Sequence, residues 1–312
     1  MIMRANWRAA LIAILAVTGM VWLIGGRTDP SSIRLRSAPA GLTVNDGATL
    51  FAAAGCANCH TDRPHGGALL AGGRALVTSF GTFYTPNISS DRDFGIGRWT
   101  DIDFIRALRR GVGPTGKDYY PSFPYPAFTQ MTDDDILAIK RYIFSLPPQR
   151  RADRAPVMHF PYRIRAGIKL WKIIYLREGP IEPDPDKTKE WNRGAYLVRA
   201  VAHCGECHTP RDLLGGVETN RRFAGANMAV DGVKAPDITP DPKAIGRWSV
   251  DDLASYLDDG LTPSGDIAGG AMAEVIRGTS ALSNEDRLAI AVFIKAQAPI
   301  PPAPMQKMSQ GG

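Results

Sequence analysis

Apolar residues recur at helical spacing in short segments, and polar capping residues mark where these segments begin. One segment starts after Thr100 and stops before Gly111; its apolar positions are Ile102, Phe104, Ile105 and Leu108. Another starts after Thr132 and stops before Pro147; its inward face holds Ile136, Ile139 and Ile143. Because Thr favours the N-cap of a helix, and Gly and Pro favour the residues after its end, both segments are predicted to be helices.

The same order of segments returns in the second half of the chain. Ile245-Gly-Arg-Trp-Ser249 repeats Ile96-Gly-Arg-Trp-Thr100, and Ala235-Pro-Asp-Ile238 repeats Thr85-Pro-Asn-Ile88. A helix cap comparable to Thr132 recurs at Ser283. Offsets between matched residues stay between 148 and 151, which indicates that one helical unit has been duplicated.

The chain is therefore predicted to be mainly α, with two tandem helical domains at residues 45–149 and 191–299. Long loops connect the helices, including glycine-rich loops from Gly66 to Gly81. Residues 150–190 form a linker that contains a basic amphipathic segment, Phe160–Leu176. Such a segment can lie on a membrane, meet a partner or pack across the two domains, and the sequence leaves these options open.

The N-terminus holds an uncharged run from Ala9 to Gly26. Its 18 residues span about 27 Å as a helix, just enough to cross the hydrocarbon core of a bilayer. Residues 1–27 are therefore predicted to be a transmembrane anchor, with a cleaved signal peptide as the alternative. Residues 28–44 are polar and turn-rich and would form a stalk, and residues 300–312 a disordered tail.

Two five-residue patterns carry the candidate chemistry: Cys56-Ala-Asn-Cys59-His60 and Cys204-Gly-Glu-Cys207-His208. Two cysteines three apart can each bond to one vinyl group of a haem, and the adjacent histidine then binds the iron. The cysteine pairs of a zinc site usually lie about 15–20 residues apart, whereas these lie 148 apart. A thioredoxin-like pair and structural disulfides fit less well. The patterns use all 4 cysteines and predict two covalently bound haem c groups.

A methionine is predicted to take the sixth position of each iron. In the first domain the candidate is Met131, which follows an aromatic, proline-rich run from Tyr119 to Phe128. In the second domain Leu282 stands in the equivalent place, so Met272 is the preferred ligand, with Met228 and an open iron as alternatives. The aromatic run has no counterpart there, so the two haems are expected to differ in potential.

Two further pairs of residues recur in both halves. Arg98 and Arg247 are candidates to donate to haem propionates, and Trp99 and Trp248 to pack against the haem edge or bond a propionate. Helix packing alone is the alternative for the tryptophans. The formal net charge of +6 favours contact with anionic lipid or an acidic protein, and nothing in the sequence resembles a nucleic-acid-binding module.

Several longer motifs resemble a known family. They are Tyr125-Pro-Ala-Phe-Thr-Gln-Met131, Leu176-Arg-Glu-Gly-Pro-Ile-Glu-Pro-Asp-Pro185, Trp191-Asn-Arg-Gly-Ala-Tyr-Leu-Val198 and His203-Cys-Gly-Glu-Cys-His-Thr-Pro210. Together they resemble the multihaem cytochrome c subunits of membrane-bound bacterial alcohol, gluconate, sorbitol, fructose and aldehyde dehydrogenases. The resemblance covers about Asn45 to Gln297 and implies two cytochrome c-like domains.

The resemblance also implies a function. Such subunits take electrons from a flavoprotein, quinoprotein or molybdenum catalytic subunit and pass them to quinone, another cytochrome or a terminal oxidase. The chain is thus expected to be a non-catalytic electron-transfer subunit, with its haem domains in the bacterial periplasm and its anchor in the inner membrane. Iron would be ligated by His60 with Met131 and by His208 with Met272. A dihaem peroxidase and a free-standing membrane-tethered shuttle are the alternatives.

Overall fold

The computed structural model describes residues 46–227 and 234–299. The predicted membrane anchor, the stalk and the C-terminal tail lie outside the described residues, as does Met228. Within the described ranges the chain is mostly helical, as predicted. None of the helices in these ranges is both long and apolar enough to cross a bilayer.

The first half of the chain contains the helices α2 (Gly47–Ala53), α3 (Cys56–His60), α4 (Asp101–Arg110), α5 (Tyr125–Phe128) and α6 (Asp133–Ser145), with a 3-10 turn, η2 (Arg63–His65), after α3. Thr100 caps α4 through a reciprocal pair of hydrogen bonds with Asp103. Thr132 caps α6 by accepting from the backbone N–H of Asp135. Both helices predicted from the capping residues are therefore confirmed.

The second half repeats this order of elements. It contains α8 (Lys189–Tyr196) with its π-helical extension η3 (Leu197–Val201), α9 (Gly205–His208), η4 (Thr219–Arg221), α10 (Val250–Asp259), α11 (Gly270–Thr279) and α12 (Asn284–Lys295). Ser249 and Asp252 form the same reciprocal cap as Thr100 and Asp103. Ser283 accepts from the N–H of Asp286, as predicted from its place before α12.

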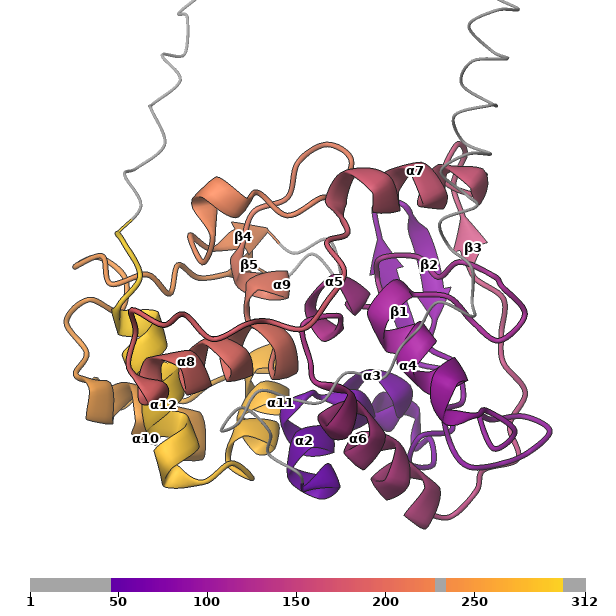
Figure 1. The fold of residues 1–312 in the computed structure, drawn as a ribbon, viewed down its shortest axis with the longest axis horizontal. Coiled ribbons are helices and arrows are strands. Elements are labelled where there is room, and N and C mark those ends of the chain that lie inside the picture. Colours follow the sequence, from indigo (N-terminus) through magenta and orange to yellow (C-terminus); the bar gives the residue numbers. More distant parts are fainter. Residues whose placement is uncertain (1–45, 228–233, 300–312) are drawn as a thin grey trace, which may run out of the picture.

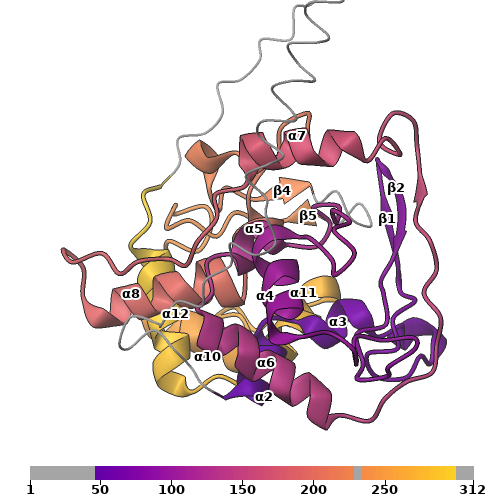
Figure 2. The same ribbon diagram turned by 45° about the vertical axis from the view of Figure 1, so that its right-hand side comes forward.

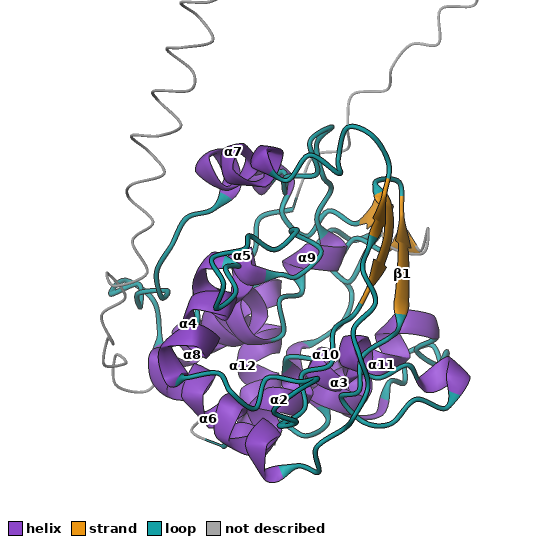
Figure 3. Cartoon of the chain, turned by 90° about the vertical axis from the view of Figure 1, so that its right-hand side faces the viewer, coloured by secondary structure: helices purple, strands orange, loops and turns teal. Residues whose placement is uncertain are grey.

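The glycine-rich stretch after the first haem pattern contains a β-hairpin, so the prediction of loops alone was wrong there. β1 (Ala75–Thr78) pairs antiparallel with β2 (Gly81–Tyr84), and β3 (Val157–Met158) from the linker adds to β2. The β-branched and aromatic side chains of these segments favour extended backbone. A shorter pair, β4 (Ala226–Asn227) and β5 (Lys234–Ala235), forms in the second half. Strand β1 stands at one side of the molecule, away from most helices (Figure 3).

In each half the first helix crosses the last helix at a glycine. α2 packs on α6 at Gly47, and α8 packs on α12 at Gly194 (Figure 1). A Cβ at Gly47 would lie 2.2 Å from the carbonyl oxygen of Ala138, and one at Gly194 would lie 1.9 Å from that of Ala289. Because no Cβ atom comes so close to a carbonyl oxygen without displacing the backbone, both crossings require glycine.

The two halves meet along packed helices. α11 lies against α2 (Figure 1), and α5 lies against η3. Buried residues of both halves form one continuous apolar cluster. Tyr196 is fully buried at this junction. Its hydroxyl donates to Asp135 Oδ2 at 2.7 Å and accepts from the N–H of Thr132 at 3.2 Å. These contacts fix the two haem patterns relative to each other.

The amphipathic part of the linker forms α7 (Ala166–Tyr175), which lies across both halves at one end of the molecule (Figure 1). Lys172 Nζ donates to Asp118 Oδ1 of the first half at 2.6 Å. Trp171 Nε1 donates to the carbonyl oxygen of Leu214 in the second half at 3.0 Å. Of the options left open by the sequence, packing across the two halves is therefore observed for the inner face of α7.

Gly194→Ala is expected to lower the free energy of unfolding by about 1–3 kcal/mol, because the added Cβ pushes α8 away from the backbone of α12. Chemical denaturation of the full haem-loaded chain measures the loss. Gly167→Ala in α7 is the control, since nothing lies within 4 Å of a Cβ at that position and Ala favours a helix. Equal stability of the two variants would contradict the close crossing.

Candidate functional site

Each histidine of the two cysteine patterns is held from behind by a backbone carbonyl. His60 Nδ1 lies 2.8 Å from the carbonyl oxygen of Pro86, and His208 Nδ1 lies 2.8 Å from that of Pro236. Because a carbonyl only accepts, Nδ1 carries the proton, and the lone pair remains on Nε2, where it can bind a metal. Burial lowers the pKa of both imidazoles and so favours the neutral form that ligates iron.

The two proline loops reach the histidines because glycines let the backbones pass closely. The N–H groups of Gly72 and Gly225 donate to the carbonyl oxygens of His60 and His208, each at 2.9 Å. Both glycines have positive φ, 70° and 75°. A Cβ at Gly72 would lie 2.5 Å from the Pro86 carbonyl carbon, and one at Gly225 would meet the second proline loop in the same way. Glycine is therefore required at both places.

The cysteines lie beside these histidines in and next to the short helices α3 and α9. Burial raises the pKa of the Cys56 and Cys204 thiols to about 12 and that of Cys207 to about 11. Across residues 46–227 and 234–299, no three His, Cys, Asp or Glu side chains gather into a metal cluster.

Met131 is fully buried at the end of the predicted aromatic run. Arg109 of α4 fixes its backbone: Nη2 donates to the Met131 carbonyl oxygen at 2.9 Å and lies 2.6 Å from Asp133 Oδ1. Next to it, Phe123 contacts the rings of Tyr119, Tyr125 and Phe128, with centroids between 5.8 and 6.3 Å apart. The aromatic side chains of the predicted run therefore form a wall of contacting rings, and contact of this wall with a haem stays a prediction.

In the second half an arginine again donates to a backbone carbonyl, but the residue that it supports is a leucine. Arg287 of α12 donates to the Leu282 carbonyl oxygen at 2.5 Å and pairs with Asp258 at 3.1 Å. Leu282 therefore occupies the place of Met131 but offers no ligand atom. Met272 lies in the first turn of α11, half-buried against the apolar cluster. The 10-residue helix α11 takes the place in the second half that the 4-residue helix α5 takes in the first. It carries a methionine that α5 lacks.

The predicted arginine and tryptophan pairs lie in different surroundings. Arg98 is exposed and donates to Asp93 at 2.9 Å, and Arg247 is exposed as well. Trp99 and Trp248 are half-buried and pack against the apolar cluster. The backbone carbonyls of both tryptophans accept from lysines of the last helix of their half, Lys140 and Lys295. Helix packing therefore accounts for the tryptophans, and contact of these four residues with a propionate stays a prediction.

Two groups of residues were missed by sequence reasoning. Pro86 and Pro236 act through backbone carbonyls, and the only signal for them was their repetition 150 residues apart. Arg199 and Arg222 form the second group. Burial lowers the pKa of both guanidinium groups, and repulsion from Arg222 adds to the effect on Arg199. Arg199 Nε is buried and has no hydrogen-bond partner among the described residues, so this pair suits an anion such as a haem propionate.

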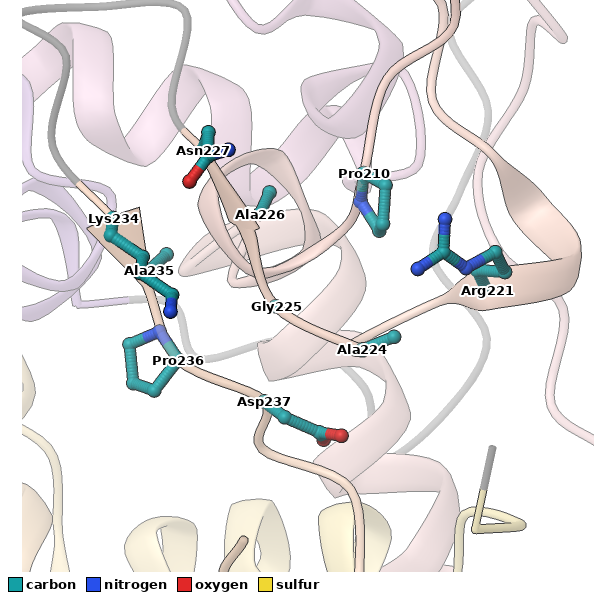
Figure 4. Close-up of a pocket in the computed structure, with 10 residues that line it drawn as sticks. All are labelled: Pro210, Arg221, Ala224, Gly225, Ala226, Asn227, Lys234, Ala235, Pro236 and Asp237. Carbon is teal, nitrogen blue, oxygen red and sulfur yellow. The ribbon is translucent and has the colours of Figure 1, made fainter. Parts of the chain in front are cut away.

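An open pocket of about 550 Å³ adjoins the loop that supports His208. Gly225 and Pro236 line it together with charged side chains, among them Arg221, Lys234 and Asp237 (Figure 4). Neither His208 nor Met272 belongs to the lining, so the pocket lies beside the second haem site.

The first attachment turn contacts the half of the chain that holds the second. Asn58 Nδ2 donates to the Glu274 carbonyl oxygen in α11 at 3.1 Å, and Arg74 pairs with the Glu274 carboxylate at 2.8 Å. The reverse contact comes from His203, directly before the second pattern, whose Nε2 lies 3.3 Å from the Ala54 carbonyl oxygen. Each attachment turn is therefore packed against the opposite half, and the first touches the helix that carries Met272.

Two cysteine pairs, each beside a histidine whose Nδ1 is held by a carbonyl, define a c-type cytochrome on this mostly helical chain. The family model for cytochrome c matches residues 44–147. A diheme cytochrome c-type protein of Cereibacter sphaeroides is 41% identical, over 92% of this chain and 95% of its own length. The chain belongs to the dihaem c-type cytochromes and carries two covalently bound haem c groups.

Cytochrome subunits of dehydrogenases are similar as well. The fructose dehydrogenase cytochrome subunit of Gluconobacter japonicus is 38% identical over 81% of this chain. The cytochrome c subunit of a quinone-dependent alcohol dehydrogenase of Gluconacetobacter polyoxogenes is 33% identical over 83% of it. The chain spans 52% and 57% of those two relatives. The family that the sequence motifs suggested is thereby confirmed.

Met131→Ala is expected to lower the potential of one haem by on the order of 0.1 V, because a thioether ligand raises the potential. The methionine–iron absorption band of that haem should disappear, while the other haem keeps its potential. A potentiometric titration with optical detection measures both effects. Leu282→Ala is the matched control, since it truncates the equivalent residue without removing a sulfur. An unchanged titration of Met131→Ala would sink the assignment.

Met272→Ala and Met228→Ala compare the two candidate ligands of the second haem. Only loss of the true ligand removes the second methionine–iron band and lowers the second potential. We expect Met272→Ala to have this effect. If Met228→Ala has it instead, Met272 is the wrong residue; if neither variant differs from the parent, the second iron is open or otherwise ligated.

Proposed function

We propose that this dihaem cytochrome is the electron-transfer component of a dehydrogenase complex and is not itself the catalytic subunit. It takes electrons from a catalytic subunit of the flavin, quinoprotein or molybdenum type and passes them to quinone, another cytochrome or a terminal oxidase. Its similarity to the cytochrome subunits of fructose and alcohol dehydrogenases supports this role. The oxidation of the substrate then belongs to another chain.

The environment of Met131 is the observation that carries the proposal. Haem c supplies a one-electron change between ferric and ferrous iron. His60 would hold the iron through Nε2, because its Nδ1 is hydrogen-bonded to Pro86, and the fully buried Met131 would supply a thioether sulfur as the other ligand. Arg109 holds the backbone of Met131 in place. An iron closed on both sides suits electron transfer, whereas turnover of peroxide requires an open or displaceable position.

The second site is proposed to use His208 and Met272, with Arg199 and Arg222 beside a propionate. The exposed Arg247 is less suited to that contact, because an exposed guanidinium gains little from pairing. The repeated histidine supports and caps favour two tandem cytochrome c domains at residues 45–149 and 191–299. Different surroundings on the methionine sides give the two haems different potentials.

Contacts between the halves support electron exchange within one chain. Ala54 lies two residues before Cys56, and His203 lies directly before Cys204, so their hydrogen bond joins the two attachment segments. The His203 ring also lies edge-on to Phe128, which belongs to the aromatic wall of the first half, with centroids 5.3 Å apart. The packed junction keeps the separation of the haems constant during transfer.

We further propose that residues 1–27 anchor the chain in the bacterial inner membrane and that both haem domains lie in the periplasm. The apolar run from Ala9 to Gly26 supports the anchor. A membrane position would bring the haems close to the respiratory chain.

The optical spectrum distinguishes electron transfer from peroxidase activity. Two low-spin haems, each with a methionine–iron band and slow to bind cyanide, are expected for the full chain. Addition of hydrogen peroxide with a reduced dye as electron donor should give no turnover. Rapid cyanide binding to a high-spin haem, together with peroxide turnover, would favour the dihaem peroxidase.

Gentle detergent extraction tests for the catalytic partner. Mass spectrometry should find a dehydrogenase catalytic chain with the cytochrome, and the substrate of that dehydrogenase should reduce both haems. If the chain purifies alone and no dehydrogenase reduces it, the free-standing shuttle is the better description.

A further inference from the structure

Exposed apolar side chains gather on one side of the molecule, around α7. Of the 14 large apolar residues that are exposed within the described ranges, 7 lie between Val157 and Ile174. On α7 itself these are Leu170, Ile173 and Ile174, whose spacing places them on one face of the helix. Leu213 and Leu214, in the loop that α7 contacts, are exposed as well. We call the surface formed by Leu170, Ile173, Ile174, Leu213 and Leu214 the α7 outer face.

The α7 outer face is held rigidly by the contacts on the opposite side of the helix. Ile168 is buried, and Tyr175 donates to Asp212 Oδ2 of the second half at 2.7 Å. The ring of Trp171 lies edge-on to Tyr125, which belongs to the aromatic wall of the first half, with centroids 6.3 Å apart. α7 therefore cannot turn its outer side chains inward without losing contacts to both halves.

The charged side chains of α7 and of its flanking residues are basic. Residues 157–177 contain five basic side chains and no Asp or Glu. Arg165 and Lys172 turn inward, toward the carbonyl oxygen and the carboxylate of Asp118. The other three, Arg163, Lys169 and Arg177, remain exposed. Nearby Asp212 is engaged by Tyr175 and by backbone N–H groups. Arg177 donates to the carbonyl oxygens of Ile173 and Leu176, and none of these three cations pairs with a carboxylate among the described residues. The surface thus combines apolar side chains with exposed positive charge.

We propose that the α7 outer face lies on the anionic lipid surface of the membrane, with Leu170, Ile173 and Ile174 inserted at the headgroup boundary. Basic and apolar groups on one helix are the combination that binds such a surface, since cations pair with lipid phosphates while apolar groups leave water. The inference rests on the proposed membrane location. The 18 residues from Thr28 to Asn45 reach about 60 Å when fully extended, so an anchored chain can make this contact.

This orientation brings the haem sites close to the lipid surface. Asp212 and Leu214, which α7 contacts, follow His208 by only 4 and 6 residues. Tyr125, on the other side, belongs to the wall next to Met131. The α7 outer face is thus separated from both sites by few side chains, which would favour delivery of electrons to an acceptor dissolved in the membrane.

Site-directed spin labelling of the full haem-loaded chain tests the proposal. All 4 native cysteines are used for haem attachment, so Ile173→Cys provides a single reactive thiol for a nitroxide label. The protein is bound to nanodiscs of phosphatidylglycerol and phosphatidylethanolamine. We expect the label at 173 to lose accessibility to a polar nickel complex and to gain accessibility to oxygen, as happens at a lipid boundary. Adding Lys169→Glu should reduce this protection, because it removes a cation from the contact.

Arg141→Cys is the control, because residue 141 is exposed on α6, at the end of the molecule opposite α7 (Figure 2). Its label should stay accessible to nickel. If the label at 173 behaves like the one at 141 while the protein co-elutes with the nanodiscs, the lipid contact is wrong although the anchor holds. If the label at 173 is protected only when a dehydrogenase subunit is bound, the α7 outer face is a protein interface, and the proposal is also wrong. Redox titration of the labelled protein reports on electron transfer separately.

Discussion

The hydrogen bond from each haem-binding histidine to a proline carbonyl is the interaction on which both sites depend. It fixes the ring orientation and the tautomer, and so decides which nitrogen can reach the iron. The bond forms because the loop that carries each proline passes very close to a glycine, Gly72 in the first half and Gly225 in the second. A Cβ at either position would collide with the loop. The positive φ of these glycines and their hydrogen bonds to the histidine carbonyls belong to the same close passage. The histidine side of the iron is therefore built in the same way in both halves.

The two halves differ on the side of the iron opposite the histidine, although an arginine supports the backbone there in both. An arginine holds the backbone at Met131 and at Leu282 alike, yet it comes from α4 in the first half and from α12 in the second. The carboxylate that pairs with it moves accordingly, from Asp133 to Asp258. Because the support persists while the side chain changes, a methionine ligand of the second iron would have to come from another element, and Met272 of α11 is the residue that we propose. Unlike surroundings on this side are expected to give the two haems different potentials.

Local signals account for what the sequence predicted well. Thr100, Thr132, Ser249 and Ser283 each bond within their own first helical turn, so their identity was enough to place four helices. The cysteine patterns and the Leu282 substitution are equally visible in the sequence. The hairpin of β1 and β2 was missed because glycines flank short extended segments. The proline carbonyls were missed because a backbone acceptor carries no residue signature. Lys172 turned inward because Asp118, 54 residues away, accepts from it, a contact that a helical wheel cannot show.

We propose that both irons have a histidine and a methionine ligand and that their potentials differ. Electron paramagnetic resonance of the full chain, recorded during a potentiometric titration, tests it most directly. We predict two low-spin ferric signals, each from one iron, that disappear in two separate one-electron steps as the potential falls. A high-spin ferric signal in the native protein, or a single step that removes both signals together, would contradict the account.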